Sequence, residues 1–262
     1  NEIILGNYTF QREGQPPDPR GGRAKPIGLI HSFFRPNDHP QAYPYLIPSQ
    51  FFVYQSLKNL FLLTKSLNWT DQFLADISLL KSYLSRILFD KKNTMITHNA
   101  GDQYGSIYAY EINGMGNQQI MDDASIPSLL SLPYLCSDEI SIDDKIYQNT
   151  RKFILSKNNP WFFSGSILEG IGGPSVGKQM VCPLAIIMRG LTTNDDREIC
   201  FVLQMLQQSH SRIGFMQESV FVNSSSRFTR ARFSWANSLF SELIWKLYRE
   251  KRYLLHERCR SR

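Results

Sequence analysis

The chain has 262 residues, of which 42% are hydrophobic and 20% are charged, a composition typical of a folded globular protein rather than a disordered one. No stretch approaches the roughly 20 uninterrupted apolar residues of a membrane-spanning helix, so no membrane span is expected. The net charge is +6, but residues 245–262 contain seven Lys or Arg against two Glu and so account for +5 of it. A nucleic-acid-binding domain spreads its basic residues over a folded face. We therefore expect a solvated basic helix end here and no nucleic-acid partner.

Residues 1–50 are rich in Pro, Gly and Arg and show no sustained periodicity, which predicts loops. Helical texture begins at Phe51. A helix that follows the capping residue Thr70 has one apolar stripe with spacings of three and four residues. The members of this stripe are Phe73, Ile77, Leu80, Leu84 and Ile87.

The segment from Tyr104 to Ile112 alternates as strands do, and it predicts one short β-hairpin closed near Asn113 and Gly114. The remaining periodic segments are helical, so the fold class is mainly α. Acidic residues in or before the first turn signal the start of two of them. The predicted helices begin at Asp143 and Asp144, at Asn194 with Asp195 and Asp196, and at about Ser238.

Long irregular segments separate these elements and contain the unusual polar residues. Loops of this length inside a compact domain are uncommon and are usually functional. The pattern indicates an active site built at one end of a helical scaffold. The segments are 93–105, 114–127, 160–183 and 210–228.

The four cysteines are widely spaced, with no CxxC pair and no Cys/His cluster suited to zinc. We interpret them as free or buried thiols and expect no metal site and no cofactor. They are Cys136, Cys182, Cys200 and Cys259. The compartment and the oligomeric state stay open.

Two acidic motifs each have a structural and a functional interpretation. Arg35 and Asp38 lie three residues apart in a Pro-bounded loop. They form either a structural ion pair or a site in which the carboxylic acid lies beside a bound sugar. Asp122 and Asp123 precede an apolar run, where Ser125 and Pro127 would start a helix. Adjacent carboxylates could instead bind a metal ion or sugar hydroxyls. Taken alone, each motif favours the structural interpretation.

The later motifs are similarly open. The glycine-rich run 170–174 lacks the spacing of a phosphate-binding loop, so nucleotide binding is set aside. Glu218 lies in an apolar-flanked loop near Arg230, and such a carboxylate can act as a general base. Phe233 and Trp235 could pack on sugar rings, although aromatics beside a helix start are more often core.

Together, and in this order, the motifs resemble glycoside hydrolase family 125, the metal-independent exo-α-1,6-mannosidases. The family has an FRPSDD segment followed by LIPS, a DDANVPSLLSLPYL segment, a GIGSPHT loop and a final MHESF and FTRPWFAWANS region. The resemblance runs from about Tyr8 to Leu247. The matching segments here are 34–39, 45–49, 122–135, 170–174, 216–219 and 228–238.

This resemblance implies an (α/α)6 barrel, or toroid, with long functional loops. The N-terminal part of the family domain is missing, so we expect the barrel to be incomplete in this chain and to expose apolar helix faces. Residues 1–248 are expected to form a partial catalytic domain, followed by a basic tail, 249–262.

The resemblance also implies an inverting mechanism, in which one carboxylic acid protonates the leaving oxygen and one carboxylate activates water. By motif position the general acid is Asp38 and the general base is Glu218. Asp38 would have to hold a proton near neutral pH, which predicts an apolar or acidic surrounding. The candidate residues for binding mannose-containing oligosaccharides or for orienting the acids are Arg35, Asp122, Asp123 and Arg230.

Several positions depart from the family pattern. His39 replaces the second Asp of the first motif, Ser175 and Val176 replace His-Thr, and Cys182 replaces a Trp. An exo-α-mannosidase is therefore the first hypothesis, and an impaired homologue that binds glycans without hydrolysis is the second. A nucleic-acid-binding helical protein rests only on the tail charge. The further departures are Gln217, Ala231 and Arg232.

Overall fold

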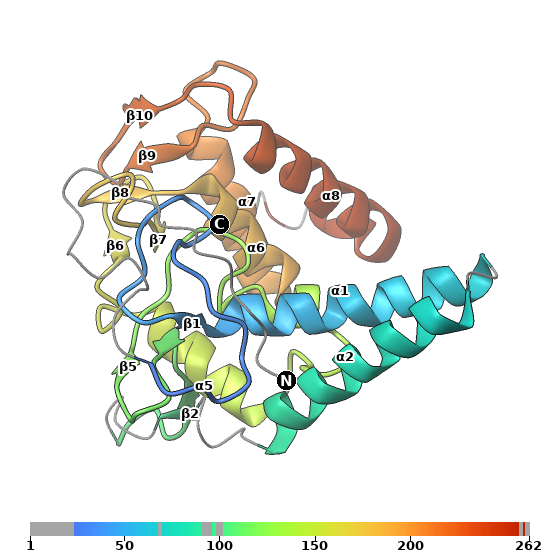
Figure 1. The fold of residues 1–262 in the computed structure, drawn as a ribbon. Coiled ribbons are helices and arrows are strands. Elements are labelled where there is room, and N and C mark those ends of the chain that lie inside the picture. Colours follow the sequence, from blue (N-terminus) through green and yellow to red (C-terminus); the bar gives the residue numbers. More distant parts are fainter. Residues whose placement is uncertain (1–23, 68–69, 91–95, 98–101, 257–258, 260–262) are drawn as a thin grey trace.

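The structure is a computed structural model that describes residues 24–67, 70–90, 96–97, 102–256 and 259. Helices make up 43% of it, and the strands are short (Figure 1). In this part of the chain, no helix has the length and apolar character needed to cross a membrane. The helices are α1 (Ile47–Ser66), α2 (Asp71–Asp90), α4 (Leu132–Leu135), α5 (Lys145–Ile154), α6 (Pro183–Leu191), α7 (Asp196–Ser209), α8 (Ser234–Glu250) and the 3-10 helix η1 (Arg252–Leu255).

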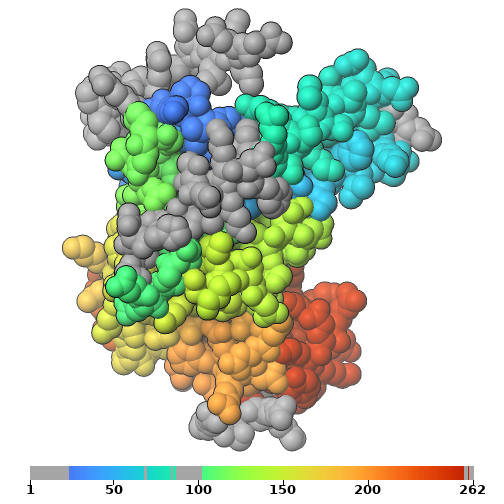
Figure 2. Space-filling view, turned by 90° about the horizontal axis from the view of Figure 1, so that it is seen from below, coloured from blue at the N-terminus to red at the C-terminus, as the bar shows by residue number. Residues whose placement is uncertain are grey.

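The helices α1 and α2 pack against each other as a hairpin that projects from the rest of the molecule (Figures 1 and 2). The predicted stripe on α2 is only partly covered: Ile77 is buried, whereas Phe73 and Leu80 are exposed. Leu79 of α2 is 71% exposed and Leu62 of α1 is 58% exposed. The expected exposure of apolar helix faces is therefore found on this hairpin.

The predicted starts of α5 and α7 are confirmed by their caps. Asp144 accepts a hydrogen bond from the Tyr147 amide at 2.9 Å, and Asp195 accepts one from the Arg197 amide at 2.9 Å. A side-chain acceptor at this position satisfies an amide that has no partner within the helix. Helix α8 begins at Ser234, four residues before the predicted start.

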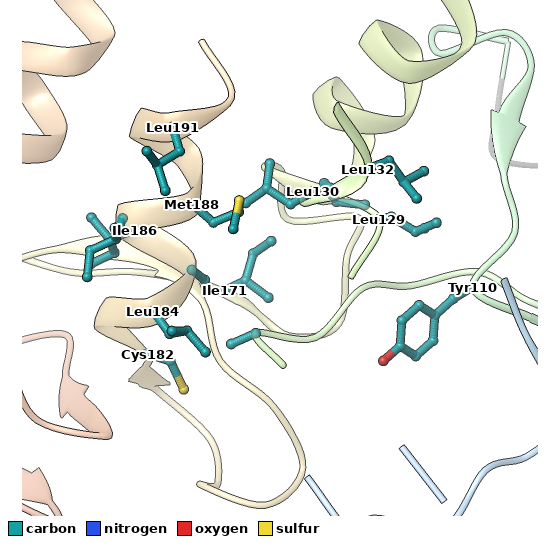
Figure 3. Close-up of a cluster of buried hydrophobic side chains, with 14 of the residues drawn as sticks. Tyr110, Leu129, Leu130, Leu132, Ile171, Cys182, Leu184, Ile186, Met188 and Leu191 are labelled. Carbon is teal, nitrogen blue, oxygen red and sulfur yellow. The ribbon is translucent and has the colours of Figure 1, made fainter. Parts of the chain in front are cut away.

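The central core surrounds α6, which the sequence did not single out. Pro183 lies at its start, where the missing N–H of proline is tolerated. Nearly all of its side chains are buried, so it lacks the polar face from which periodicity is recognised. Figure 3 shows Leu184 and Met188 on the side of α6 that faces Leu129 and Leu130.

The prediction of one hairpin was wrong, because the described residues form several small antiparallel sheets. The hairpin closed near Asn113 does exist, as the pair β4–β5, but β3 pairs with β2 instead. The sheets are β1-β4-β5, β10-β9-β8, β2-β3 and β6-β7. The strands are β1 (Tyr45–Leu46), β2 (Ile96–Thr97), β3 (Ile107–Tyr108), β4 (Glu111–Ile112), β5 (Gln118–Gln119), β6 (Phe162–Ser164), β7 (Glu169–Ile171), β8 (Met180–Val181), β9 (Ser219–Phe221) and β10 (Ser224–Thr229).

The C-terminal segment is attached to α7 rather than only solvated. Cys200 on α7 forms a disulfide with Cys259, so the prediction of four free thiols was wrong for this pair. The two lie 59 residues apart in sequence, and η1, which precedes Cys259, packs beside α8. Leu254 is buried, and Lys251 forms an ion pair with Asp196 at 2.6 Å. The predicted domain boundary at 248/249 falls inside α8, and the division into domain and tail stays a prediction.

Candidate active site

Asp38 lies in a tight turn of the loop that precedes α1. The Arg35 amide donates to the His39 carbonyl at 2.8 Å, and the Asp38 amide donates to the Arg35 carbonyl at 3.0 Å. Phe34 and Pro40 pair as an isolated bridge on either side of the turn. Asp38 has φ 62°, in the left-handed region that Asp adopts more readily than most residues. Asp38 is exposed in this structure, and the apolar or acidic surrounding expected for it stays a prediction.

A buried ion pair holds this turn against β4. Arg35 Nε lies 2.6 Å from Glu111 Oε1, and both side chains are buried. Glu111 Oε2 accepts hydrogen bonds from the Ala42 and Tyr43 amides at 2.8 and 3.2 Å. Burial acts to lower the pKa of Arg35, but the hydrogen bond and charge of Glu111 outweigh it and raise that pKa above its ordinary value. Glu111 therefore holds the segment that contains Asp38 from both sides.

Asp122 organises the backbone that follows it. It is fully buried, and its two oxygens accept hydrogen bonds from the Leu129 and Leu130 amides at 2.9 and 3.0 Å. Burial raises its pKa well above the ordinary value, against the opposing effect of the Leu129 amide. The alternative of a helix start capped by Ser125 was wrong, because the helix here, α4, begins only at Leu132. The side chain of Asp122 therefore satisfies two backbone amides of this loop that have no helical partner.

Asp123 lies between the turn that contains Arg35 and Asp38 and the glycine-rich run 170–174. It accepts a hydrogen bond from the Ser125 amide at 2.9 Å, and its Oδ2 is 3.7 Å from Arg35 Nη1. Burial raises its pKa. A Cβ placed on Gly173 would lie 3.5 Å from Asp123 Cβ, so the glycine-rich run packs against the Asp123 side chain. Asp123 thus joins the Arg35 turn to the glycine-rich loop.

Glu218 immediately precedes β9 and is held from β10. Its amide donates to the Thr229 and Arg230 carbonyls at 3.2 Å each. Thr229 Oγ1 donates to Glu218 Oε2 at 3.1 Å, and Arg230 Nη1 lies 3.4 Å from Glu218 Oε1. The Glu218 side chain is 22% exposed and that of Arg230 is 70% exposed. Glu218 is therefore held at its backbone amide and at carboxylate oxygen Oε2.

One pocket of about 310 Å³ brings three of the six predicted residues together: Asp38, Glu218 and Arg230. This volume lies at the lower end of ordinary small-molecule sites. Arg35, Asp122 and Asp123 are not part of its lining but are buried in supporting contacts. The other lining residues are Pro36, Asn37, Ala124, Ser125, Ser175, Val176, Cys182, Leu184, Phe233 and Trp235.

Three of the positions that depart from the family pattern line this pocket: Ser175, Val176 and Cys182. Ser175 Oγ accepts a hydrogen bond from Asn37 Nδ2 at 3.4 Å, which joins the Asp38 turn to the glycine-rich loop. Burial raises the pKa of the Cys182 thiol, so this side chain is a neutral wall of the pocket. These positions affect the shape of the pocket.

The other four departures, His39, Gln217, Ala231 and Arg232, do not line the pocket. His39 Nδ1 lies 3.2 Å from the Pro40 carbonyl. Gln217 is fully buried, and its Nε2 donates to the Ser209 carbonyl at 3.3 Å. Gln217 therefore ties the residue before Glu218 to the end of α7.

Two supporting residues were missed from the sequence, Glu111 and Thr229. Glu111 is the one charge within an otherwise apolar strand segment, 107–112, and a charge in such a position signals a buried partner. Thr229 gave no comparable signal, because only strand pairing places it beside Glu218. Two carboxyl groups on one pocket are suited to proton transfer to and from a bound molecule. In the described part of the chain, no three His, Cys, Asp or Glu side chains could together hold a metal ion.

A model of the family described as metal-independent alpha-mannosidase (GH125) matches residues 2–245 of the chain. The chain belongs to glycoside hydrolase family 125. It is 40% identical over 256 residues to the meiotically up-regulated gene 157 protein of Schizosaccharomyces pombe, a match that covers 95% of this chain and 49% of that protein.

A solved family 125 structure is also similar to the chain. It is a Streptococcus pneumoniae protein from a family of metal-independent alpha mannosidases, in a non-productive complex with alpha-1,6-mannobiose. The TM-score is 0.81 with 36% sequence identity, over 88% of this chain and 53% of the other. The chain therefore spans about half the length of both relatives.

Proposed function

We propose that the protein is an exo-acting α-mannosidase that removes α-1,6-linked mannose with inversion of configuration. The observation that carries this proposal is the single pocket lined by Asp38 and Glu218 in a chain of this family. The two residues are 180 positions apart in sequence, since 218 − 38 = 180. The linkage is supported by the alpha-1,6-mannobiose bound in the S. pneumoniae relative.

In the proposed reaction, Asp38 donates its proton to the glycosidic oxygen as the bond between that oxygen and the anomeric carbon breaks. Glu218 accepts a proton from a water molecule whose oxygen attacks the anomeric carbon from the opposite face. An inverting enzyme needs the two carboxyl groups roughly 6.5–9.5 Å apart so that this water fits between substrate and base. The released sugar is then β-mannose.

The remaining lining residues are suited to recognition of the sugar. Arg230 extends into solvent beside Glu218 and could donate hydrogen bonds to mannose hydroxyls. Trp235 is 54% exposed, and Phe233 lies 5.4 Å from it between ring centroids, so the pair offers an aromatic face for a sugar ring. Arg35, Asp122 and Asp123 would act from behind the pocket, by fixing the Asp38 turn and the loop that follows.

We further propose that this chain forms part of an (α/α)6 barrel. The exposed apolar side chains of α1 and α2 and the twofold greater length of both relatives support this view. The remaining helices of the barrel would cover these faces and enclose Asp38. The domain division, a partial catalytic domain at 1–248 and a basic tail at 249–262, belongs to the same proposal.

The direct test is hydrolysis of α-1,6-mannobiose, followed by NMR of the first anomer formed. We expect β-mannose from the wild-type protein and a loss of turnover in Glu218→Gln. The matched control is Glu250→Gln, because Glu250 is exposed at the end of α8, outside the pocket lining. Release of α-mannose would contradict inversion, and full activity in Glu218→Gln would contradict the role of Glu218.

The alternative is a homologue that binds glycans without hydrolysing them. It is favoured by His39, Ser175 and Cys182, two of which line the pocket. Calorimetric titration of the protein with α-1,6-mannobiose separates the two functions. Binding without release of mannose would support the alternative, whereas release of mannose excludes it.

A further inference from the structure

A pair of hydroxyl groups lies directly behind Glu218. The strands β9 and β10 are antiparallel, and their register places Thr229 opposite Ser219. Thr229 Oγ1 is 2.6 Å from Ser219 Oγ and 3.1 Å from Glu218 Oε2. Ser219 is fully buried. The three side chains therefore form one continuous chain of hydrogen bonds that ends at the carboxylate.

The direction of this chain follows from a count of protons. An ionised carboxylate can only accept hydrogen bonds, so the single hydroxyl proton of Thr229 points to Glu218. Thr229 then has only lone pairs to offer to Ser219, and Ser219 must be the donor. The Ser219 hydroxyl therefore donates to Thr229 Oγ1, and the Thr229 hydroxyl donates to Glu218 Oε2. Hydrogen bonds in such a chain strengthen one another.

This series of hydrogen bonds places the two carboxylate oxygens of Glu218 in different surroundings. Oε2 is bound by Thr229, whereas Oε1 lies 3.4 Å from the exposed guanidinium of Arg230. The last torsion of a Glu side chain has broad, roughly two-fold preferences, so an unbound carboxyl group would rotate. A donor fixed on one oxygen holds the other in a constant direction.

We propose that Thr229, backed by Ser219, is a positioning residue that presents Oε1 of Glu218 to the attacking water. This inference rests on the proposed inverting mechanism. In that step the water O–H bond breaks, its proton goes to Oε1, and the water oxygen forms the new bond to the anomeric carbon. The bond to the leaving oxygen breaks as Asp38 protonates it. Thr229 transfers no proton to the substrate and acts through its hydrogen bond to Glu218.

A purely structural role for Thr229 makes a different prediction. If the two hydroxyls only satisfy each other inside the hairpin, their loss lowers stability but leaves the pH dependence of turnover unchanged. Thr229→Val keeps the branched shape and removes the donor. Thr229→Ser keeps the donor and removes a methyl group. The two variants therefore separate the hydroxyl from its packing.

The experiment measures kcat, KM and the pH profile on α-1,6-mannobiose, with thermal melting of every variant. We expect Thr229→Val to lower kcat about 10- to 100-fold, as for loss of one hydrogen bond to a charged group, with KM changed by less than about threefold. The acid limb of its kcat/KM profile should move to higher pH. Thr229→Ser should recover most of the lost kcat, and Ser219→Ala should lower kcat in the same direction by a smaller factor.

The matched control is Ser226→Ala, which removes an exposed hydroxyl from the same strand β10. Wild-type kcat and pH profile in a folded Thr229→Val variant would overturn the inference. Equal losses in the Val and Ser variants would also overturn it, because packing would then explain both. If Thr229→Val does not fold, Ser219→Ala decides, and an unchanged profile in that variant is contrary to the proposal. An inactive wild-type protein would instead overturn the proposed function, and with it the role of Thr229.

Discussion

Arg35 and Glu111 form a buried ion pair, with 2.6 Å between Arg35 Nε and Glu111 Oε1 across 76 residues of sequence. The pair joins the loop that contains Asp38 to strand β4. Arg35 also lies 5.2 Å from the centre of the Tyr110 ring and 3.7 Å from Asp123 Oδ2. The position of Asp38 thus depends on a charge that lies outside the pocket lining.

Replacing Glu111 by Gln should lower the free energy of unfolding by about 3–5 kcal/mol, the range for breaking a buried ion pair. The Gln side chain cannot neutralise Arg35. Its NH2 group would face the backbone amides of Ala42 and Tyr43, which now donate hydrogen bonds to Glu111 Oε2. Urea unfolding measures the loss. The control is Asp138→Asn, which breaks the exposed pair with Lys58 and should cost less than about 1 kcal/mol. Equal losses in the two variants would contradict the role of the buried pair.

The fold could be predicted where side chains signal the ends of elements. Asp144 and Asp195 cap α5 and α7, and both helices were predicted from those residues. α6 was missed because almost all its side chains are buried and the helix is short. Most of the strands were missed because nearly all have only two or three residues, too few for an alternating pattern. The disulfide between Cys200 and Cys259 depends on packing that spacing does not reveal.

The site was predictable only in part. Motif order identified Asp38 and Glu218, and the structure places both on one pocket. The residues that hold them were not predictable, because Glu111 and Thr229 reach their partners through tertiary and strand pairing. Asp122 shows the reverse case: it was a candidate for binding mannose hydroxyls or for orienting the acids, and its observed contacts are with backbone amides.

Asp38→Asn should lower kcat/KM on α-1,6-mannobiose about 10²- to 10⁴-fold, the usual contribution of general acid catalysis. The loss should be much smaller on α-mannosyl fluoride, because fluoride leaves without a proton. Glu218→Gln should be impaired on both substrates, since activation of water does not depend on the leaving group. Steady-state kinetics with the two substrates check this pattern. Equal impairment of Asp38→Asn on both would exclude Asp38 as the general acid.

Asp122→Asn should destabilise the protein by about 1–3 kcal/mol, because one amide of the Leu129–Leu130 pair would lose its acceptor. The cost should depend on pH. Burial raises the pKa of Asp122 in the folded state above the unfolded value of about 3.9. The wild-type stability from this group is therefore complete below about pH 4 and is lost as pH rises through the folded pKa.

The difference in unfolding free energy between wild type and Asp122→Asn should accordingly be largest in acid and shrink as pH rises. Urea unfolding at a series of pH values gives this difference, in which the titration of other carboxyl groups cancels. Asp138→Asn, at an exposed position, is the control for loss of a carboxyl group. A difference that grows with pH would mean that Asp122 is stabilised as the anion.

Removing the disulfide by the double change Cys200→Ser and Cys259→Ser should lower the free energy of unfolding by about 2–4 kcal/mol. The bond restricts the unfolded chain and holds the C-terminal segment against α7, where Gln204 Nε2 also donates to the Cys259 carbonyl at 3.0 Å. A reductant should lower the melting temperature of the wild type and leave that of the double variant unchanged. Thiol titration in denaturant should give two reactive groups before reduction, from Cys136 and Cys182, and four afterwards. Four thiols before reduction in protein from an oxidising compartment would show that the pair does not form.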